Sequence, residues 1–287
     1  MRRRTASHAS EGFRCQPGLA ELYFGCYFMA IPQVASTEQL EIIGRIAADR
    51  VKDGQIVGLG SGKAAQAFVR ALGGRVHESG LRIEGVPTSE LTASIARQCG
   101  VPLVSLSQID RIDLDVDGAD EVTPELNLLK GGGGNLLREK VIASIARELI
   151  VVVGEEKLTP RLGTRFPVFV EVVEFALPVV QRRLRAMGAR TADARKNPDG
   201  SMFHTDNGNP LVHAQFPVDH PLMAQPEQLE VALRAIAGTV ETGLFINYAS
   251  EVIIAMLDGS VESATAGHRR KIIAGHATGV KGGAINS

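Results

Sequence analysis

Short apolar runs that end in glycine or acidic residues alternate with helical patterns along most of the chain, and this alternation restricts the possible folds. The run "QIVGLG" (55–60), for example, precedes the helical pattern "KAAQAFVRAL" (63–72). Strands separated by helices predict a parallel sheet covered by helices, hence an α/β fold. Ligands bind such sheets outside the carboxyl ends of the strands. The segments "GLGSGK", "VPTSE", "DGADE" and "GEEK" each follow a predicted strand at that position.

The first elements follow from residue spacing. A helix is predicted over 36–51, where apolar residues recur at helical spacing and Ser36 or Thr37 can cap the N-terminus. Strands are predicted at 55–60, 81–88, 102–106, 111–120 and 148–156.

The pattern changes after residue 167. A helix is predicted at 177–189, and a strand–turn–strand unit at 202–216 is centred on "DNGN", because Asn-Gly tolerates positive φ. With a further helix at 226–238, this predicts a small α+β domain over 168–238. The main domain is then formed by 33–167 and 239–260, and a strand and a helix within 240–257 return the chain to it.

The two ends of the chain differ in composition from its middle. Residues 1–32 begin with three arginines and contain a short apolar run, but Glu11 and Glu21 interrupt the segment between them, which disfavours a cleaved targeting signal. We expect a disordered extension, or a true start at Met29. The tail over 261–287 is polar and Gly/Ala-rich, and we expect it to be disordered as well.

The composition excludes several classes of function. The formal net charge is −1, so no global field attracts nucleic acid or an anionic membrane, and any anion site must be local. No stretch reaches the roughly 18–20 apolar residues of a membrane span. Cys15, Cys26 and Cys99 lack CxxC spacing, which suits a reducing cytoplasm, and the scattered histidines predict no metal site.

The turn "GLGSGK" (58–63) opens a helix, where free amide N–H groups and the positive end of the helix dipole favour a phosphate. It matches neither GxGxxG nor GxxxxGK[ST], so no dinucleotide or Walker site is supported. A plain strand–helix turn remains the alternative. Lys63 weakens that alternative, because a cation at a helix start is unfavourable unless an anion is bound there.

Carboxylates gather at the end of the strand "RIDLDVDGADEV" (111–122). Asp117 ends the strand and Asp120 follows across a Gly-Ala turn. Two converging carboxylates suit proton transfer or recognition of sugar hydroxyls. They can equally cap the next turn.

The segment "KGGGGNLLREK" (130–140) places four glycines between Lys130 and a helix that carries Glu139. The helix has apolar residues at Val141, Ile142 and Ile145, and Glu139 lies near the edge of this stripe. Partial burial would raise the pKa of Glu139 toward the range of a general base, although the helix dipole opposes this. An ordinary N-terminal glutamate is the alternative, but four glycines exceed what a simple connection needs. Lys157 in "GEEKLTP" is, by itself, a solvated lysine.

In order and spacing, a series of segments between residues 38 and 258 resembles the ribose-5-phosphate isomerase type A family. The matching segments are "GLGSG", "VPTSE", "DGADEV", "KGGGGNLLREK", "VVVGEEKL", "FPVFVEV" and "TDNGN". The succession of "DGADE", "KGGGG" and "REK" is the most specific part of the match.

The resemblance implies a Rossmann-like main domain with a parallel sheet and a smaller α+β, ferredoxin-like domain. It also implies an aldose–ketose isomerase that interconverts ribose 5-phosphate and ribulose 5-phosphate, without a cofactor or a metal. The expected partner is a small sugar phosphate, in a cytoplasmic homodimer or homotetramer that binds neither nucleic acid nor a membrane.

Residue roles follow from the same resemblance. Glu139 matches the general base that moves a proton between C1 and C2 through a cis-enediolate, and Asp117 and Asp120 match the acidic pair that binds the sugar and assists ring opening. Lys130 and the amides of residues 131–133 match the group that steadies the developing enediolate oxygen. The remaining substrate-binding positions are Ser61, Gly62, Lys63, Ala64, Gly118, Ala119, Gly131, Gly132, Gly133 and Lys157.

The chain departs from the family pattern at three places. Ser61-Gly62-Lys63-Ala64 stands where the family usually has Thr-Gly-Ser-Thr, so two hydroxyl donors are lost and Lys63 offers charge in their place. Leu40 stands near a lysine found in many members, and His213 where an aspartate is expected. These changes concern phosphate geometry rather than the proton-transfer residues.

A non-catalytic sugar-phosphate sensor with the same fold is the alternative function. A sensor would need the phosphate turn but not Glu139 with Lys130, and this chain shows the opposite: a complete catalytic set and an altered turn. A related aminosugar-phosphate deaminase or CoA-transferase fits the fold class but lacks the "DGADE" and "KGGGG" series.

Overall fold

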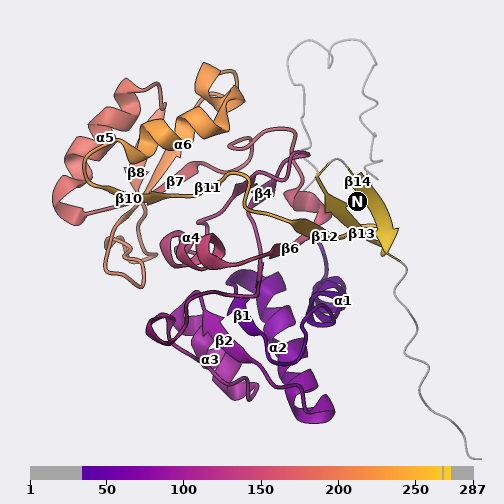
Figure 1. The fold of residues 1–287 in the computed structure, drawn as a ribbon. Coiled ribbons are helices and arrows are strands. Elements are labelled where there is room, and N and C mark those ends of the chain that lie inside the picture. Colours follow the sequence, from indigo (N-terminus) through magenta and orange to yellow (C-terminus); the bar gives the residue numbers. More distant parts are fainter. Residues whose placement is uncertain (1–33, 267, 273–287) are drawn as a thin grey trace, which may run out of the picture. The chain divides into compact units, whose positions relative to one another are not determined.

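The computed structural model describes residues 34–266 and 268–272 (Figure 1). The predicted extension over 1–32 and the end of the predicted tail, 273–287, lie outside these residues. The main sheet has the strand order β14-β13-β12-β6-β3-β1-β2. Its strands are β1 (Ile56–Leu59), β2 (Glu84–Pro87), β3 (Leu114–Asp117), β6 (Leu149–Gly154), β12 (Glu251–Ala255), β13 (Val261–Thr265) and β14 (His268–Ile272).

The strands from β12 to β2 run parallel, as the alternating pattern predicts. Helices α1 (Thr37–Ala48) and α2 (Gly62–Ser79) pack against each other and against this sheet, and α3 (Glu90–Gln98) packs against α2 and β2. Ser36 caps α1 through its side chain, as expected. Helix α4 (Leu136–Ile145) contacts β3 and carries the predicted base. The α/β fold with a Rossmann-like sheet is thus confirmed.

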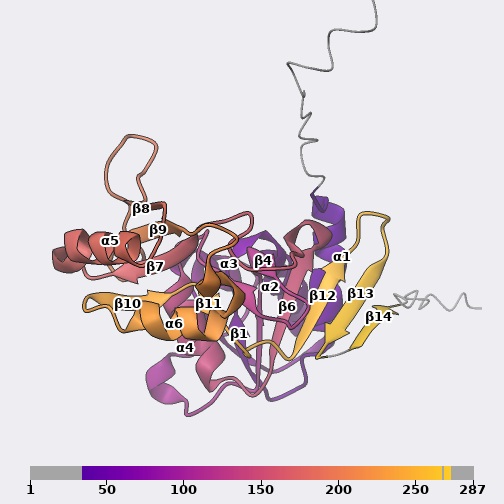
Figure 2. The ribbon, with the colours of Figure 1, turned by 90° about the horizontal axis from the view of Figure 1, so that it is seen from above.

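The sheet extends further than the sequence predicts. Residues 261–265 and 268–272 form β13 and β14, which pair antiparallel beyond β12, so the predicted disorder from residue 261 is wrong for these residues (Figure 2). The strand is hidden in the sequence because β13 is mostly polar. Its burial nevertheless alternates, with Val261 6% and Ser263 1% exposed.

Two other assignments from the sequence are wrong. The helix predicted near residue 250 is β12, whose Val252, Ile253 and Ile254 are buried and paired to β6; branched side chains favour such a strand. The strand predicted at 102–106 is reduced to one bridge, between Leu103 and Gly85, and leads into a 3₁₀ turn. Pro102, which precedes the bridge, has no N–H to donate.

The second sheet is antiparallel, with the order β10-β7-β9-β8. Its elements are β7 (Val168–Val172), α5 (Leu177–Ala186), β8 (Thr191–Ala194), β9 (Leu211–Gln215), α6 (Pro226–Arg234) and β10 (Thr239–Thr242). This β-α-β-β-α-β succession is the ferredoxin-like arrangement expected for the smaller unit. Because β10 pairs with β7, this sheet includes residues up to 242. The division into two domains, with its predicted boundary at 238, stays a prediction.

A third, small sheet joins these parts. It contains β4 (Glu121–Val122), β5 (Leu128–Leu129) and β11 (Leu244–Phe245), in the order β11-β5-β4. Short 3₁₀ helices cover Leu106–Gln108, Glu155–Lys157, Glu174–Ala176 and Pro221–Ala224. In the described part of the chain, no helix combines the length and apolar character needed to cross a membrane.

Candidate active site

A pocket of 340 Å³ opens at the carboxyl ends of β1, β3 and β6, where a parallel sheet places its ligands. It contains every predicted site residue except Asp117 and Gly132. The lining residues are Val34, Ala35, Leu40, Ser61, Gly62, Lys63, Ala64, Gly118, Ala119, Asp120, Lys130, Gly131, Gly133, Glu139, Val152, Val153, Gly154, Glu156 and Lys157. The turns "GLGSGK", "DGADE" and "GEEK" therefore meet in one place, whereas no residue of "VPTSE" lines the pocket.

Lys130 is the centre of the site. Its Nζ lies 2.9 Å from Oδ2 of Asp117 and 3.4 Å from Oε2 of Glu139. All three side chains are buried, with exposed fractions of 4%, 2% and 7% respectively. Apart from its ion pair with Lys130, Glu139 Oε2 has no partner within the described residues, and Glu139 lines the pocket, so its carboxylate can exchange a proton with a bound molecule.

Burial changes the protonation of this group. Burial raises the pKa of Glu139 to about 8, against the charge of Lys130, while Asp117 adds to the rise. Burial also raises the pKa of Asp117, although Lys130 and two backbone amides oppose it. Burial lowers the pKa of Lys130, but the charges of Asp117 and Glu139 outweigh it and hold this pKa above its ordinary value. The site thus combines a permanent cation with a carboxyl group able to exchange a proton near neutral pH.

Asp117 and Gly132 do not line the pocket, and their contact with the substrate stays a prediction. Asp117 Oδ1 accepts hydrogen bonds from the amides of Ser61 and Gly118, at 2.9 and 2.7 Å, and Oδ2 pairs with Lys130. The Gly132 amide donates to Oδ2 of Asp120 at 2.8 Å. Apart from Gly118, these partners lie at least twelve residues away in the sequence, which is why sequence patterns did not reveal them.

The backbone conformation requires glycine at the two ends of the run 131–134. Gly131 and Gly134 have φ values of 126° and 86°, in the region that disfavours side chains. A Cβ on Gly131 would also lie 2.7 Å from Cβ of Phe169. The bare backbone therefore lets the chain turn tightly past β7 before α4 begins.

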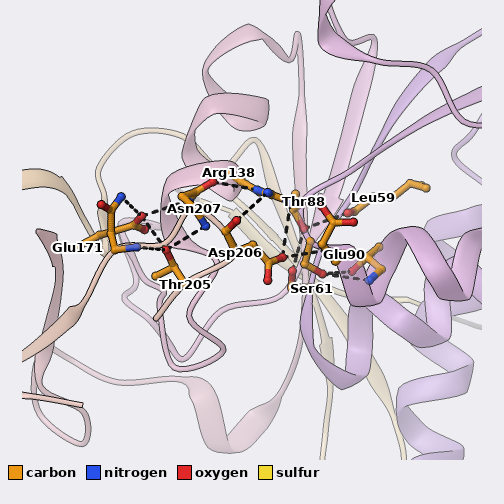
Figure 3. Close-up of polar contacts among 12 residues, drawn as sticks. Leu59, Ser61, Thr88, Glu90, Arg138, Glu171, Thr205, Asp206 and Asn207 are labelled. Atoms are coloured by element: carbon orange, nitrogen blue, oxygen red, sulfur yellow. Dashed lines mark hydrogen bonds and ion pairs between the residues drawn. The ribbon is translucent and has the colours of Figure 1, made fainter. Parts of the chain in front are cut away.

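The glycine-rich turn after β1 opens α2 beside the pocket. Ser61 Oγ pairs with Thr88 Oγ1 at 2.8 Å, and Thr88 in turn donates to the carbonyl of Leu59 (Figure 3). The Ser61 side chain makes no capping hydrogen bond to α2. Lys63 is exposed in the first turn of α2 and lines the pocket. This arrangement fits an anion at the helix start.

The pocket also holds residues that sequence reasoning did not select. Glu156 lies beside Lys157, and its Oε2 accepts a hydrogen bond from the Ala35 amide at 3.2 Å. Leu40 presents an apolar side chain to the pocket. The "GEEK" segment pointed to this region, and both Glu156 and Lys157 line the pocket.

Asp115 is a second residue that the sequence did not reveal as part of the site. It is 1% exposed, and neither carboxyl oxygen makes a hydrogen bond within the described residues. Burial, followed by the charge of Asp117, raises the pKa of Asp115 well above its ordinary value. The sequence does place Asp115 two residues before Asp117 on one strand. Residues at this spacing share one face of a sheet, so the spacing could have indicated that the two carboxyl groups lie close together.

No cluster of three or more His, Cys, Asp or Glu side chains suited to a metal ion occurs in residues 34–266 and 268–272. The expectation of a metal-free, cofactor-free site stays a prediction.

The family model for ribose 5-phosphate isomerase A (phosphoriboisomerase A) matches residues 84–259. The chain is 42% identical over 222 residues to ribose-5-phosphate isomerase A of Bacillus mycoides (strain KBAB4), covering 77% of this chain and 97% of that protein. Ribose 5-phosphate isomerase A of Methanocaldococcus jannaschii is 36% identical, with a TM-score of 0.73 and coverage of 80% and 100%. A D-ribose-5-phosphate isomerase in complex with phospho-erythronic acid is 36% identical, with a TM-score of 0.75 and coverage of 81% and 99%.

Proposed function

The chain belongs to the ribose 5-phosphate isomerase A family, and from this premise we propose that it interconverts D-ribose 5-phosphate and D-ribulose 5-phosphate. The observation that carries the proposal is the buried Lys130–Glu139 pair in a pocket lined by an anion-binding turn. The related structure that holds phospho-erythronic acid supports a phosphorylated sugar derivative as the ligand.

Glu139 acts as the general base in this proposal. Its carboxylate takes the proton from C2 of the open-chain aldose. The electron pair of that C–H bond forms the C1=C2 double bond of a cis-enediolate while the π pair of the C1 carbonyl moves onto O1. The proton of the C2 hydroxyl passes to O1, the C2=O bond forms, and C1 takes the proton back from Glu139, which gives the ketose and regenerates the carboxylate. A pKa of about 8 suits both halves of this exchange, because the proton is neither too weakly nor too strongly held.

Lys130 stabilises the negative charge that develops on the enediolate oxygen. A fixed cation in a buried site stabilises such charge more than solvent does, because it needs no reorientation during the reaction. Asp117, which does not line the pocket, holds Lys130 through an ion pair of 2.9 Å between Oδ2 and Nζ. Asp120 lines the pocket and is oriented by the Gly132 amide, so we assign it the sugar hydroxyls and ring opening.

The phosphate end of the substrate is assigned to the start of α2 and to Lys157. Ser61–Ala64 supply amides and the charge of Lys63, and Lys157 lines the same pocket. Lys157 Nζ also lies 5.2 Å from the ring centre of Phe166, which orients its side chain. A cytoplasmic homodimer or homotetramer that works without cofactor completes the proposal.

The proposal is tested by mixing the purified protein with ribose 5-phosphate and measuring ribulose 5-phosphate, then repeating the assay with Glu139→Gln. This variant keeps the shape of the side chain but removes the base, so kcat should fall by at least about 100-fold. Absence of turnover by the wild type refutes the activity. Undiminished turnover by Glu139→Gln refutes the assigned base.

A further inference from the structure

Helix α4 receives little support from its own N-terminus, although Glu139 lies in its first turns. Asn135 makes no side-chain capping hydrogen bond, and Gly134 precedes it with a positive φ. A helix of ten residues is marginal by itself, so its orientation depends on tertiary contacts. The two residues beside Glu139 supply such contacts.

Arg138 ties α4 to α3 and to the turn after residue 204 (Figure 3). Its guanidinium donates to Glu90 Oε1 at 2.8 Å, to Asn207 Oδ1 at 3.0 Å and to the Asp206 carbonyl at 3.1 Å. Asp206 also accepts the Glu90 amide at 2.9 Å, which closes the network.

The turn that Arg138 contacts is itself anchored in the second sheet. The side chains of Thr205, Asn207 and Asn209 all donate to Oε1 of Glu171, at 2.9, 3.2 and 2.9 Å. Glu171 lies on β7 and is fully buried. Arg138 is therefore connected to the core of that sheet rather than to a free loop.

Lys140 ties α4 to the same unit from another side. Its Nζ donates to Glu230 on α6 at 2.9 Å, to Glu241 on β10 at 3.0 Å and to the carbonyl of Leu244 at 2.7 Å. Lys140 is 4% exposed, and its Nζ lies 4.9 Å from the ring centre of Phe245. A buried lysine with this many partners has one defined position.

Glu139 differs from both neighbours, since its only ion pair within the described residues is with Lys130 at 3.4 Å. Consecutive helical residues project about 100° apart, so Arg138 and Lys140 fix the helix on either side of Glu139. Loss of either contact would let α4 rotate or shift. A displacement of about 1 Å at a reacting group can lower a rate by about 100-fold.

We propose that Arg138 and Lys140 are positioning residues that hold the Glu139 carboxylate against Lys130 by fixing α4 to residues 205–244. The expected effect on kcat rests on the proposed function. The fixed position of α4 does not depend on that function. Lys140 should contribute more than Arg138, because buried ion pairs are less screened than exposed ones.

The test uses Lys140→Met and Arg138→Met, with Arg182→Met on the exposed side of α5 as the matched control. We expect kcat for ribose 5-phosphate to fall about 10- to 100-fold, more for Lys140→Met, with KM within about twofold, because the phosphate contacts lie on other elements. The control should retain wild-type kcat.

Lys140→Met removes the nearer of the two cations that pair with the buried Glu241, leaving Arg234 at 3.7 Å, and can destabilise the chain. The double variant Lys140→Met/Glu241→Gln removes that charge, and it should recover thermal stability while kcat stays low. A folded single or double variant with kcat within twofold of the wild type overturns the role of Lys140.

Hydrogen exchange of the amides over 136–141 provides a readout that needs no turnover. Exchange there should be faster in both single variants and unchanged in Arg182→Met. Unaltered exchange overturns the positioning role, whether or not the wild type is an isomerase. A wild type without isomerase activity refutes only the proposed function.

Discussion

The ammonium group of Lys130 lies 3.4 Å from the carboxylate of Glu139, with both side chains almost completely buried. The same ammonium lies 2.9 Å from Asp117. One ammonium group thus pairs with two carboxyl groups in a buried site, where little solvent screens their charges. The protonation of Glu139, and the stability of the site, both depend on this arrangement.

The rate should depend on pH through Glu139. Burial raises its pKa to about 8, and the base must be ionised to act, so kcat/KM should increase as the pH rises through about 8. Initial rates between pH 6 and 10 at constant ionic strength measure this. The second ionisation of a phosphate ester, near pH 6, precedes the increase expected near pH 8. A rate that is flat from pH 6.5 to 9 would contradict the assignment.

Stability should depend on pH in the opposite direction. Folded Glu139 keeps its proton up to about pH 8, whereas in the unfolded chain its pKa returns to 4.5, so the folded state binds more protons between these values. The free energy of unfolding should therefore fall as pH rises through this window, by at most about 1.4 kcal/mol per pH unit from this group. Urea unfolding at pH 5.5, 7 and 8 should show a steeper fall for the wild type than for Glu139→Gln. Equal dependence of the unfolding free energy on pH in the two proteins would contradict the raised pKa of Glu139.

Lys130→Met should damage both activity and stability. It leaves Asp117 and Glu139 buried without their cation, and breaking a buried pair in this way typically costs about 3–5 kcal/mol. The rate should also fall, because no cation faces the enediolate oxygen. Chemical denaturation and the isomerase assay check the two effects.

A double variant separates these effects. Lys130→Met/Asp117→Asn removes one of the stranded charges, so it should recover part of the stability lost in Lys130→Met while remaining inactive. Recovery of activity together with stability would show that Lys130 acts only on folding.

Lys63→Ala should raise KM for ribose 5-phosphate several-fold and change kcat less, because ground state and transition state share a phosphate contact. Lys52→Ala, on an exposed lysine outside the pocket, is the control. An unchanged KM in Lys63→Ala would identify Lys63 as an ordinary solvated lysine.

Gly131→Ala should destabilise the protein by about 1–3 kcal/mol, the usual cost of a side chain in a strained backbone conformation. Its φ of 126° and the close approach of Phe169 both oppose a Cβ. Gly133 lies in the same run, but the nearest atom to an added Cβ is 3.5 Å away, so Gly133→Ala should unfold close to the wild-type temperature. Equal melting temperatures of the two variants would remove the conformational explanation.

The location of the site could be predicted from the sequence because it depends on local chemistry. Turn residues after strands, such as those around Ser61 and Asp120, follow from short patterns, and parallel strands bring these turns to one edge. The pairing of side chains within the site could not be predicted this way. Asp117 pairs with Lys130 because of contacts between segments that are distant in the sequence.

Helix α4 shows the limit of hydrophobic patterns. Val141 was predicted to be part of the apolar stripe but is 40% exposed, whereas its neighbour Lys140 is buried. The pattern fails because Lys140 finds acidic partners on α6 and β10, which no single segment reveals. The strand β13 was missed for a similar reason, since its polar residues are held by pairing with β12.

Asp115 gives the site a property that concerns thermodynamics of binding rather than catalysis. Asp115 is one of three buried carboxyl groups here, with Asp117 and Glu139, of which the latter two pair with Lys130, and burial raises the pKa of each of the three. Each of these carboxyl groups therefore holds its proton to a higher pH than the same group does in water. An anion entering beside them favours the uptake of more. Calorimetric titrations should then give heats that vary with the ionisation enthalpy of the buffer, and the slope of that variation counts the protons taken up on binding.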